Sequence, residues 1–171
     1  LTAPDGLQLG GPKTPLPLRW ATRFGRSLAG AIAVSAQTGF RKAEWTRAAS
    51  DAPYTGLAWK HVWWVLRGHT YTGVPPAALL RSPCAGDCCV LQPPSSKPDQ
   101  FDVEWGDKPI YLPYLPGEQV SAFCALRDIA LHDAANVAPD SPVFTDDFGA
   151  ALLAHTMDDV LKRLLKARLG E

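Results

Sequence analysis

Residues 58–66 constrain the fold of this chain most strongly, because they read Ala-Trp-Lys-His-Val-Trp-Trp-Val-Leu and are followed by Arg67-Gly68. Aromatic and β-branched residues fit the pleated, half-buried surface of a strand, and glycine is typical of the turn that ends one. Trp63 and Trp64 are neighbours in this strand, so they point to opposite faces and at most one of them faces solvent or a ligand. The segment therefore predicts a strand in the middle of the chain.

A helical pattern precedes this strand. Between residues 18 and 32, apolar side chains recur at three- and four-residue steps, while arginines lie off that stripe. Gly39 is placed to end the helix through a positive-φ conformation. A short second helix is expected to follow, from about Lys42 to Ala49.

The helical pattern returns in the last third of the chain. Apolar residues follow the helical period from Val120 to Leu131, and the pattern ends before Asn136. Thr156-Met157-Asp158-Asp159 has the form of a capping box, in which the threonine hydroxyl and the second aspartate accept exposed amides at a helix start. The apolar face of this last helix is expected to consist of Val160, Leu161, Leu164, Leu165 and Leu169.

Residues 88–92 and 109–113 read as two further strands, with Lys97 on the connection between them. Proline gives up a ladder donor, so the prolines at 93, 94 and 113 suit strand ends. The prediction is an α+β fold, mostly helical, with a small three-stranded antiparallel sheet covering one side of a helical core. Residues 1–17, with Gly10-Gly11 and three prolines, are expected to be a linker or tail, and residues 18–171 to be one partial domain.

Charge is distributed unevenly along the chain, although the formal net charge is zero. Residues 1–70 hold nine Lys and Arg against three acidic residues, a net +6, and the remainder is correspondingly acidic. Such a distribution is compatible with one basic face that meets a polyanion, and it is equally what a solvated, arginine-rich helix gives. A neutral total is poor support for DNA binding, because DNA-binding domains usually carry a basic excess.

Three of the four cysteines lie within residues 84–89, too few and too close together for a disulfide framework. A tetrahedral zinc site built from Cys84, Cys88 and Cys89 with Cys124 or His132 is the alternative. Adjacent cysteines in a strand point to opposite faces, so no metal ligand is predicted. No charged-then-apolar leader and no apolar run of about 18 residues is visible, so an intracellular setting without a membrane partner is expected.

Two motifs carry candidate chemistry. The first places an arginine at a glycine-relieved bend after a helix-like run, in Thr38-Gly39-Phe40-Arg41-Lys42-Ala43-Glu44-Trp45. The second is a turn with a lysine, Ser95-Ser96-Lys97-Pro98-Asp99-Gln100-Phe101, followed by Trp105-Gly106. In this order they resemble the first arginine motif, T-G-[LF]-R-x-x-E, and the lysine-bearing hairpin turn of tyrosine recombinases, the phage-integrase family.

The resemblance implies a catalytic role for three residues. In that family, the arginine at the Arg41 position contacts the scissile phosphate, the lysine at the Lys97 position acts as general acid, and the acidic residue at the Glu44 position supports the site. Trp59-Lys60-His61-Val62 also resembles the family's W-x-D-[VI] segment, with His61 where an aspartate is common. Lys42, Arg47 and Lys60 share the basic segment and are candidate DNA-binding residues, with an ordinary solvent-facing role as the alternative.

The resemblance covers only the N-terminal part of such a catalytic domain. No histidine in the chain is followed three residues later by arginine, and all four tyrosines precede the position expected for the nucleophile. The expected function is DNA recombination or integration, with this piece alone unable to form a phosphotyrosine link. Its expected partner is duplex DNA, with self-association on DNA and no small-molecule cofactor, and its location DNA-associated. A catalytically inactive DNA-binding relic of a mobile element is the alternative.

Overall fold

The structure is a computed structural model, which describes residues 6–7, 17–92, 94, 108–118, 121–134 and 137–169. Within these ranges it is an α+β fold with helices α1 (Arg23–Thr38), α2 (Ala77–Arg81), α3 (Ala122–His132) and α4 (Ala154–Leu169). Single 3-10 turns, η1 (Lys42–Glu44) and η2 (Trp59–His61), lie between α1 and the sheet. The α+β class predicted from the sequence is confirmed.

The sheet has four strands among the described residues, one more than predicted. These are β1 (Val62–Leu66), β2 (His69–Thr72), β3 (Cys88–Leu91) and β4 (Ile110–Pro113), in the order β2-β1-β3-β4 with antiparallel neighbours. The missed strand is β2. Arg67 and Gly68 both have positive φ, 52° and 78°, so they form a two-residue hairpin turn and not a strand stop.

The strand predicted over residues 58–66 is shorter than expected, because Trp59–His61 forms the 3-10 turn η2. The predicted separation of the two tryptophans is confirmed, since Trp64 is fully buried and Trp63 is half-buried. Trp64 packs edge-to-face against Phe123 of α3, with ring centroids 5.5 Å apart, and its indole N–H donates to Gly73 O. The sheet is therefore fixed to α3 on one face.

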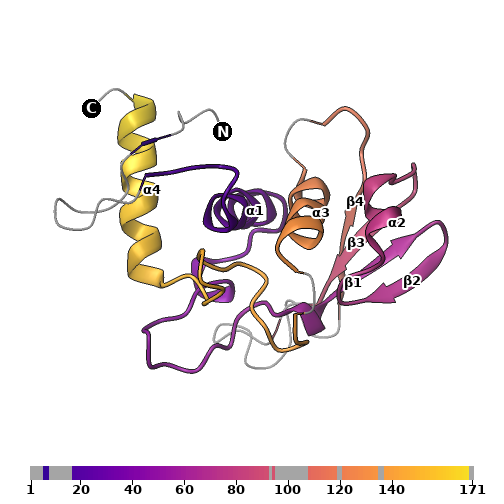
Figure 1. Cartoon of the computed structure of the whole chain (residues 1–171), viewed down its shortest axis with the longest axis horizontal. Helices are drawn as coiled ribbons and strands as arrows, with labels where there is room; N and C mark the ends of the chain where they lie inside the picture. The colour runs from indigo at the N-terminus through magenta and orange to yellow at the C-terminus, as the bar shows by residue number, and fades with distance from the viewer. Residues whose placement is uncertain are drawn as a thin grey trace.

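The layers follow one another in the order α4, α1, α3 and sheet, as Figure 1 shows from left to right. Gly30 of α1 allows α3 to come close, because a Cβ at that position would lie 2.6 Å from Ile129 Cδ1 and 3.1 Å from Phe144 Cε1. One continuous hydrophobic core runs through these layers and includes Trp64, Phe123, Phe144 and, from α4, Met157.

The helix α1 begins later than the periodicity suggested and ends where predicted. Thr22 caps it by accepting the Gly25 N–H, while Leu18 lies ahead of the helix, fully buried and hydrogen-bonded through its main chain to Gly6 and Leu7. Gly39 ends the helix with φ 74°, and its N–H donates to Ser35 O. The glycine stop expected before Arg41 is therefore confirmed.

Two predicted helix boundaries are wrong. The helix expected from Lys42 to Ala49 is only the 3-10 turn Lys42–Glu44, because the chain after it is bound elsewhere: Leu57 N–H donates to Glu44 O, and Arg47 N–H donates to Leu152 O. The last helix starts at Ala154, so Thr156 lies inside it and is not its cap. The Arg47 carbonyl accepts the Ala154 N–H instead, at 2.9 Å.

The expected apolar face of α4 is only partly buried. Val160 and Leu164 belong to the core and Leu161 is half-buried, while Leu165 and Leu169 are exposed. For α3, the predicted helical stretch is confirmed from Ala122 onward, with the Ser121 side chain accepting the Cys124 N–H. Val120, Asn136 and most of the expected linker lie outside the described residues.

Candidate nucleic-acid interface

Arg41 lies on a fixed section of main chain directly after the glycine that ends α1. Its N–H donates to Glu44 Oε2 at 2.6 Å, and the Glu44 N–H donates back to Arg41 O at 2.9 Å. Glu44 is only 8% exposed, which makes this pair of hydrogen bonds a protected clamp. The Glu44 carboxylate therefore binds the main chain of Arg41 and not its guanidinium.

The Arg41 side chain itself is exposed. Within the described parts of the chain, its guanidinium has no ion pair and no hydrogen bond, in contrast to Arg23, Arg26 and Lys42. A free, permanently charged fork on a rigid main chain is suited to bidentate binding of a phosphate. Trp45, directly after this turn, is buried and packs edge-to-face against Phe144, with ring centroids 6.2 Å apart. This packing anchors the end of the turn in the core.

Lys97, the second predicted catalytic residue, lies outside the described residues, as does the rest of its motif. The strands on either side of it are described. β3 and β4 are antiparallel neighbours in which Leu91 pairs with Ile110, so the connection that carries Lys97 joins two adjacent strands, as the sequence predicted.

The turn of Arg41 and the start of the Lys97 connection are both bound to the segment 57–61. On one side, Leu57 N–H donates to Glu44 O at 2.8 Å. On the other, Gln92 N–H, the first after β3, donates to His61 O at 2.9 Å. This short segment therefore links the two motifs through main-chain hydrogen bonds.

The three candidate DNA-binding residues are bound to groups of the same chain. Lys42 Nζ lies 2.6 Å from Asp158 Oδ1 of α4, and Lys60 Nζ lies 2.7 Å from Asp140 Oδ1. Each lysine lowers the pKa of its partner, chiefly through the side-chain hydrogen bond. Arg47 donates from Nη1 to Ser50 O at 3.1 Å. Both lysine pairs are exposed, so DNA phosphates can compete for them.

A partly buried cluster that sequence reasoning missed joins α1 to the end of α3. Arg26 binds Asp133 bidentately, with Nε to Oδ2 at 2.8 Å and Nη2 to Oδ1 at 2.7 Å. Arg23 donates from Nη2 to the Asp133 main-chain oxygen at 2.8 Å. No local signal marks this cluster, because the partners are more than a hundred residues apart in the sequence.

The cluster and the lysine pairs together explain the uneven charge of the sequence. Every Lys or Arg ion pair found in the described residues joins a base from the first 70 residues to an acid from the remainder. Four of the nine Lys and Arg residues in the first 70 are thus paired with acids from the remainder. A uniform basic face does not follow from the charge of residues 1–70.

His61 lies at the position where tyrosine recombinases, whose W-x-D-[VI] segment residues 59–62 resemble, commonly have an aspartate. Its Nδ1 accepts the Ala58 N–H at 3.0 Å, across the single turn η2. Burial lowers the pKa of His61, and the neighbouring Lys60 charge adds to this, so the neutral, accepting form is favoured. An aspartate at this position could accept the same amide.

The cysteine cluster does not form a metal site in the part of the chain that is described. Cys84 is exposed and Cys89 is buried, and no group of three or more His, Cys, Asp or Glu side chains there is placed to hold an ion. Burial raises the pKa of the Cys89 thiol.

Tyr54 is the tyrosine whose hydroxyl group is most clearly held in place by the fold. The hydroxyl donates to Leu57 O, and burial raises the pKa of Tyr54, which disfavours a nucleophilic phenolate.

Comparison of the chain with protein-family models, curated proteins and solved structures found no match. None of the described helices is both long and apolar enough to cross a membrane.

Proposed function

We propose that this chain is the phosphate-binding part of an enzyme that cleaves and rejoins DNA strands, with Arg41 and Lys97 acting on one phosphodiester. The single observation that carries the proposal is the exposed guanidinium of Arg41, which has no partner among the described residues and extends from a main chain that buried Glu44 holds in place. The hydrogen bonds between Arg41 and Glu44 fix the main chain from which the Arg41 side chain extends. The resemblance to tyrosine recombinases suggests the reaction.

The chemistry explains why these residue types are needed. Attack on a phosphodiester creates extra negative charge on the non-bridging oxygens, and the departing sugar oxygen needs a proton. Arg41 remains charged at any working pH and can donate two parallel hydrogen bonds to those oxygens. Lys97 would supply the proton, because neighbouring cations or burial lower a lysine pKa. Removing one such preorganised donor typically costs about 10²–10³ in rate.

DNA binding without cleavage is the second candidate. It needs the cation of Arg41 but no nucleophile, and Tyr54, whose hydroxyl donates to Leu57 O and whose pKa is raised by burial, is poorly suited to be one. The two candidates agree on binding and differ in the covalent step. A nicked suicide duplex distinguishes them when it is incubated with a longer protein that contains this chain and a nucleophilic tyrosine, because only a cleaving enzyme becomes covalently attached to it.

Binding is tested with the 171-residue chain and a duplex over a range of salt concentrations. Each phosphate contact contributes about 0.9 to the slope of log K against log salt, so Arg41→Ala is expected to reduce that slope by about 1. Arg81→Ala, an exposed arginine at the end of α2, is the matched control and is expected to leave the slope unchanged. Absence of salt-dependent binding, or equal slopes for wild type and Arg41→Ala, would contradict the proposal.

A further inference from the structure

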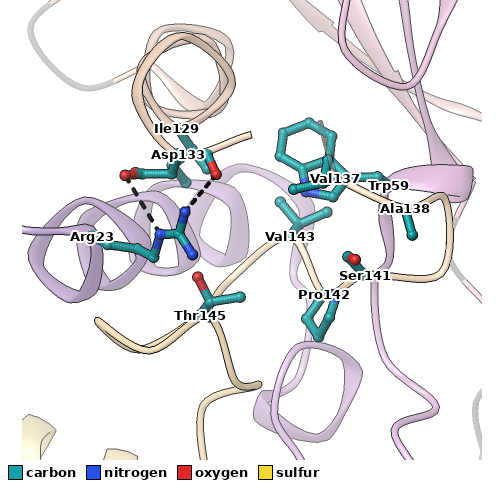
Figure 2. A pocket seen from close by; sticks show the side chains of 11 residues that line it. Arg23, Trp59, Ile129, Asp133, Val137, Ala138, Ser141, Pro142, Val143 and Thr145 are labelled. Carbon is teal, nitrogen blue, oxygen red and sulfur yellow. Dashed lines mark hydrogen bonds and ion pairs between the residues drawn. The ribbon is translucent and has the colours of Figure 1, made fainter. Parts of the chain in front are cut away.

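A cavity of about 250 Å³ lies between α1, α3, η2 and the loop 137–149, away from Arg41. Figure 2 shows Arg23 and Thr145 at one side of it and Trp59 with Val137 at the other. Ile129, Pro142 and Val143 complete an apolar wall. The cavity therefore combines polar groups with one apolar wall, and a few convergent polar groups beside an apolar surface are typical of small-molecule sites.

Only some of the hydrogen-bond donors of the Arg23 guanidinium have partners among the described residues. Nη2 donates to the Asp133 main-chain oxygen at 2.8 Å, and Nε lies 3.8 Å from Asp133 Oδ1. Both carboxylate oxygens of Asp133 are already hydrogen-bonded to Arg26 at 2.7–2.8 Å. The three groups together therefore carry one net positive charge, and Nη1 of Arg23 has no hydrogen bond to any described residue. Asp147, in the loop that precedes α4, accepts the Phe24 N–H at the start of α1 at 2.9 Å, and its negative charge also acts on Arg26, so it offsets part of this positive charge.

Space is left open beside that free nitrogen. Gly149 lines the cavity with φ +84°, and a Cβ there would lie 2.9 Å from Arg23 Nη1. Glycine suits this position because of its positive φ, and the absence of a side chain leaves Nη1 uncovered on this side. An anion entering the cavity can reach Nη1 from this side.

Two further donors open into the same cavity. Thr145 is 8% exposed and its N–H donates to Ser27 Oγ at 3.0 Å, but its hydroxyl has no hydrogen bond within the described chain. Trp59 is 2% exposed, and its indole N–H likewise has no partner among the residues described. Both atoms stay accessible to solvent, because neither is among the fully buried side-chain atoms that lack a partner. A ligand in the cavity can therefore accept from the Thr145 hydroxyl while its apolar part lies against the Trp59 ring.

We propose that this cavity binds a small organic carboxylate with a flat apolar body. The carboxylate accepts from Arg23 Nη1 and the Thr145 hydroxyl, and the apolar body lies between Trp59 and Val143. A cavity of about 150 Å³ holds benzene, so 250 Å³ accommodates an aromatic ring with a carboxylate attached. Arginine is suited to the charged end, because its planar fork matches a carboxylate.

Benzoate is the probe for this site, titrated into the 171-residue chain and followed by the nitrogen–proton NMR signals of Trp59 Nε1 and Arg23 Nε. Saturable shifts of both signals are expected, with Kd of about 1 mM or tighter. Arg23→Gln is expected to weaken binding about 10- to 100-fold, as for a hydrogen bond to a charged group. Arg81→Gln, with an exposed arginine outside the cavity, is the control and keeps the wild-type Kd.

Thr145→Val keeps the main-chain bond to Ser27 and tests the site without touching the Asp133 cluster, should Arg23→Gln fail to fold. It is expected to weaken benzoate binding about 10-fold or more, as for loss of a hydrogen bond to a charged group. Benzyl alcohol, the neutral counterpart, is expected to bind at least about 10-fold more weakly than benzoate. The proposal is overturned if benzyl alcohol binds as tightly as benzoate, if Thr145→Val leaves the Kd unchanged, or if benzoate gives no saturable shift.

Discussion

His61 gives the chain a residue that responds to pH next to both candidate motifs. The ring accepts the Ala58 N–H only while Nδ1 is unprotonated, and the same residue's carbonyl accepts the Gln92 N–H that begins the Lys97 connection. Protonation therefore removes one hydrogen bond from the segment that joins the two motifs.

Because of His61, the free energy of unfolding is expected to decrease as the pH falls. Burial lowers the folded-state pKa of His61 below the ordinary 6.5, so the unfolded chain takes up the proton first as pH decreases. The contribution of His61 is thus complete above pH 6.5 and is lost as pH falls through 6.5 toward the folded-state pKa. Urea midpoints measured at about pH 7 and pH 5 should differ less in His61→Asn, whose amide oxygen accepts at either pH. His69→Asn, at an exposed position on β2, should keep the wild-type difference, and an equal difference in His61→Asn would contradict this role.

At the level of elements, the β1–β2 hairpin depends on a single buried carboxylate. Arg67 has φ 52°, a left-handed conformation that costs a residue other than glycine. Asp87 is 3% exposed and accepts the Arg67 N–H at 2.7 Å and the Cys84 N–H at 2.8 Å. It therefore fixes the hairpin turn against the chain that enters β3.

Asp87→Ala is expected to lower the free energy of unfolding by about 2–4 kcal/mol, because two amides lose their charged acceptor. Chemical denaturation measures this loss. Asp51→Ala removes an exposed carboxylate and should change stability by less than about 0.5 kcal/mol. A similar small change in Asp87→Ala would show that the hairpin turn does not need this contact.

The elements that the sequence predicted are those set by local pattern. The glycine stop at Gly39, the helical period of α3 and the two strands around Lys97 all depend on neighbouring residues. The missed features depend on distant ones. β2 needs a turn supported by Asp87, twenty residues beyond Arg67, and α4 starts early because the distant Arg47 carbonyl accepts its first amide.

For the molecule as a whole, the sequence predicted the charge asymmetry but not what the fold does with it. The pairs Lys42–Asp158 and Lys60–Asp140 span long stretches of chain, and no local pattern announces them. Arg41 keeps its free guanidinium in the described structure, as its proposed role requires. The cavity beside Arg23 was equally beyond sequence reasoning, since its walls come from four separate segments.

The most direct test asks whether Arg41 and Lys97 act on the same phosphate. A double-mutant cycle with Arg41→Ala, Lys97→Ala and the double variant, read as free energies of binding to one duplex, measures their coupling. Two side chains that share one phosphate are expected to be non-additive by about 0.5–3 kcal/mol, while the control pair of Arg41→Ala with Arg81→Ala should be additive. Additivity of Arg41 and Lys97 within about 0.3–0.5 kcal/mol would contradict the proposed joint site.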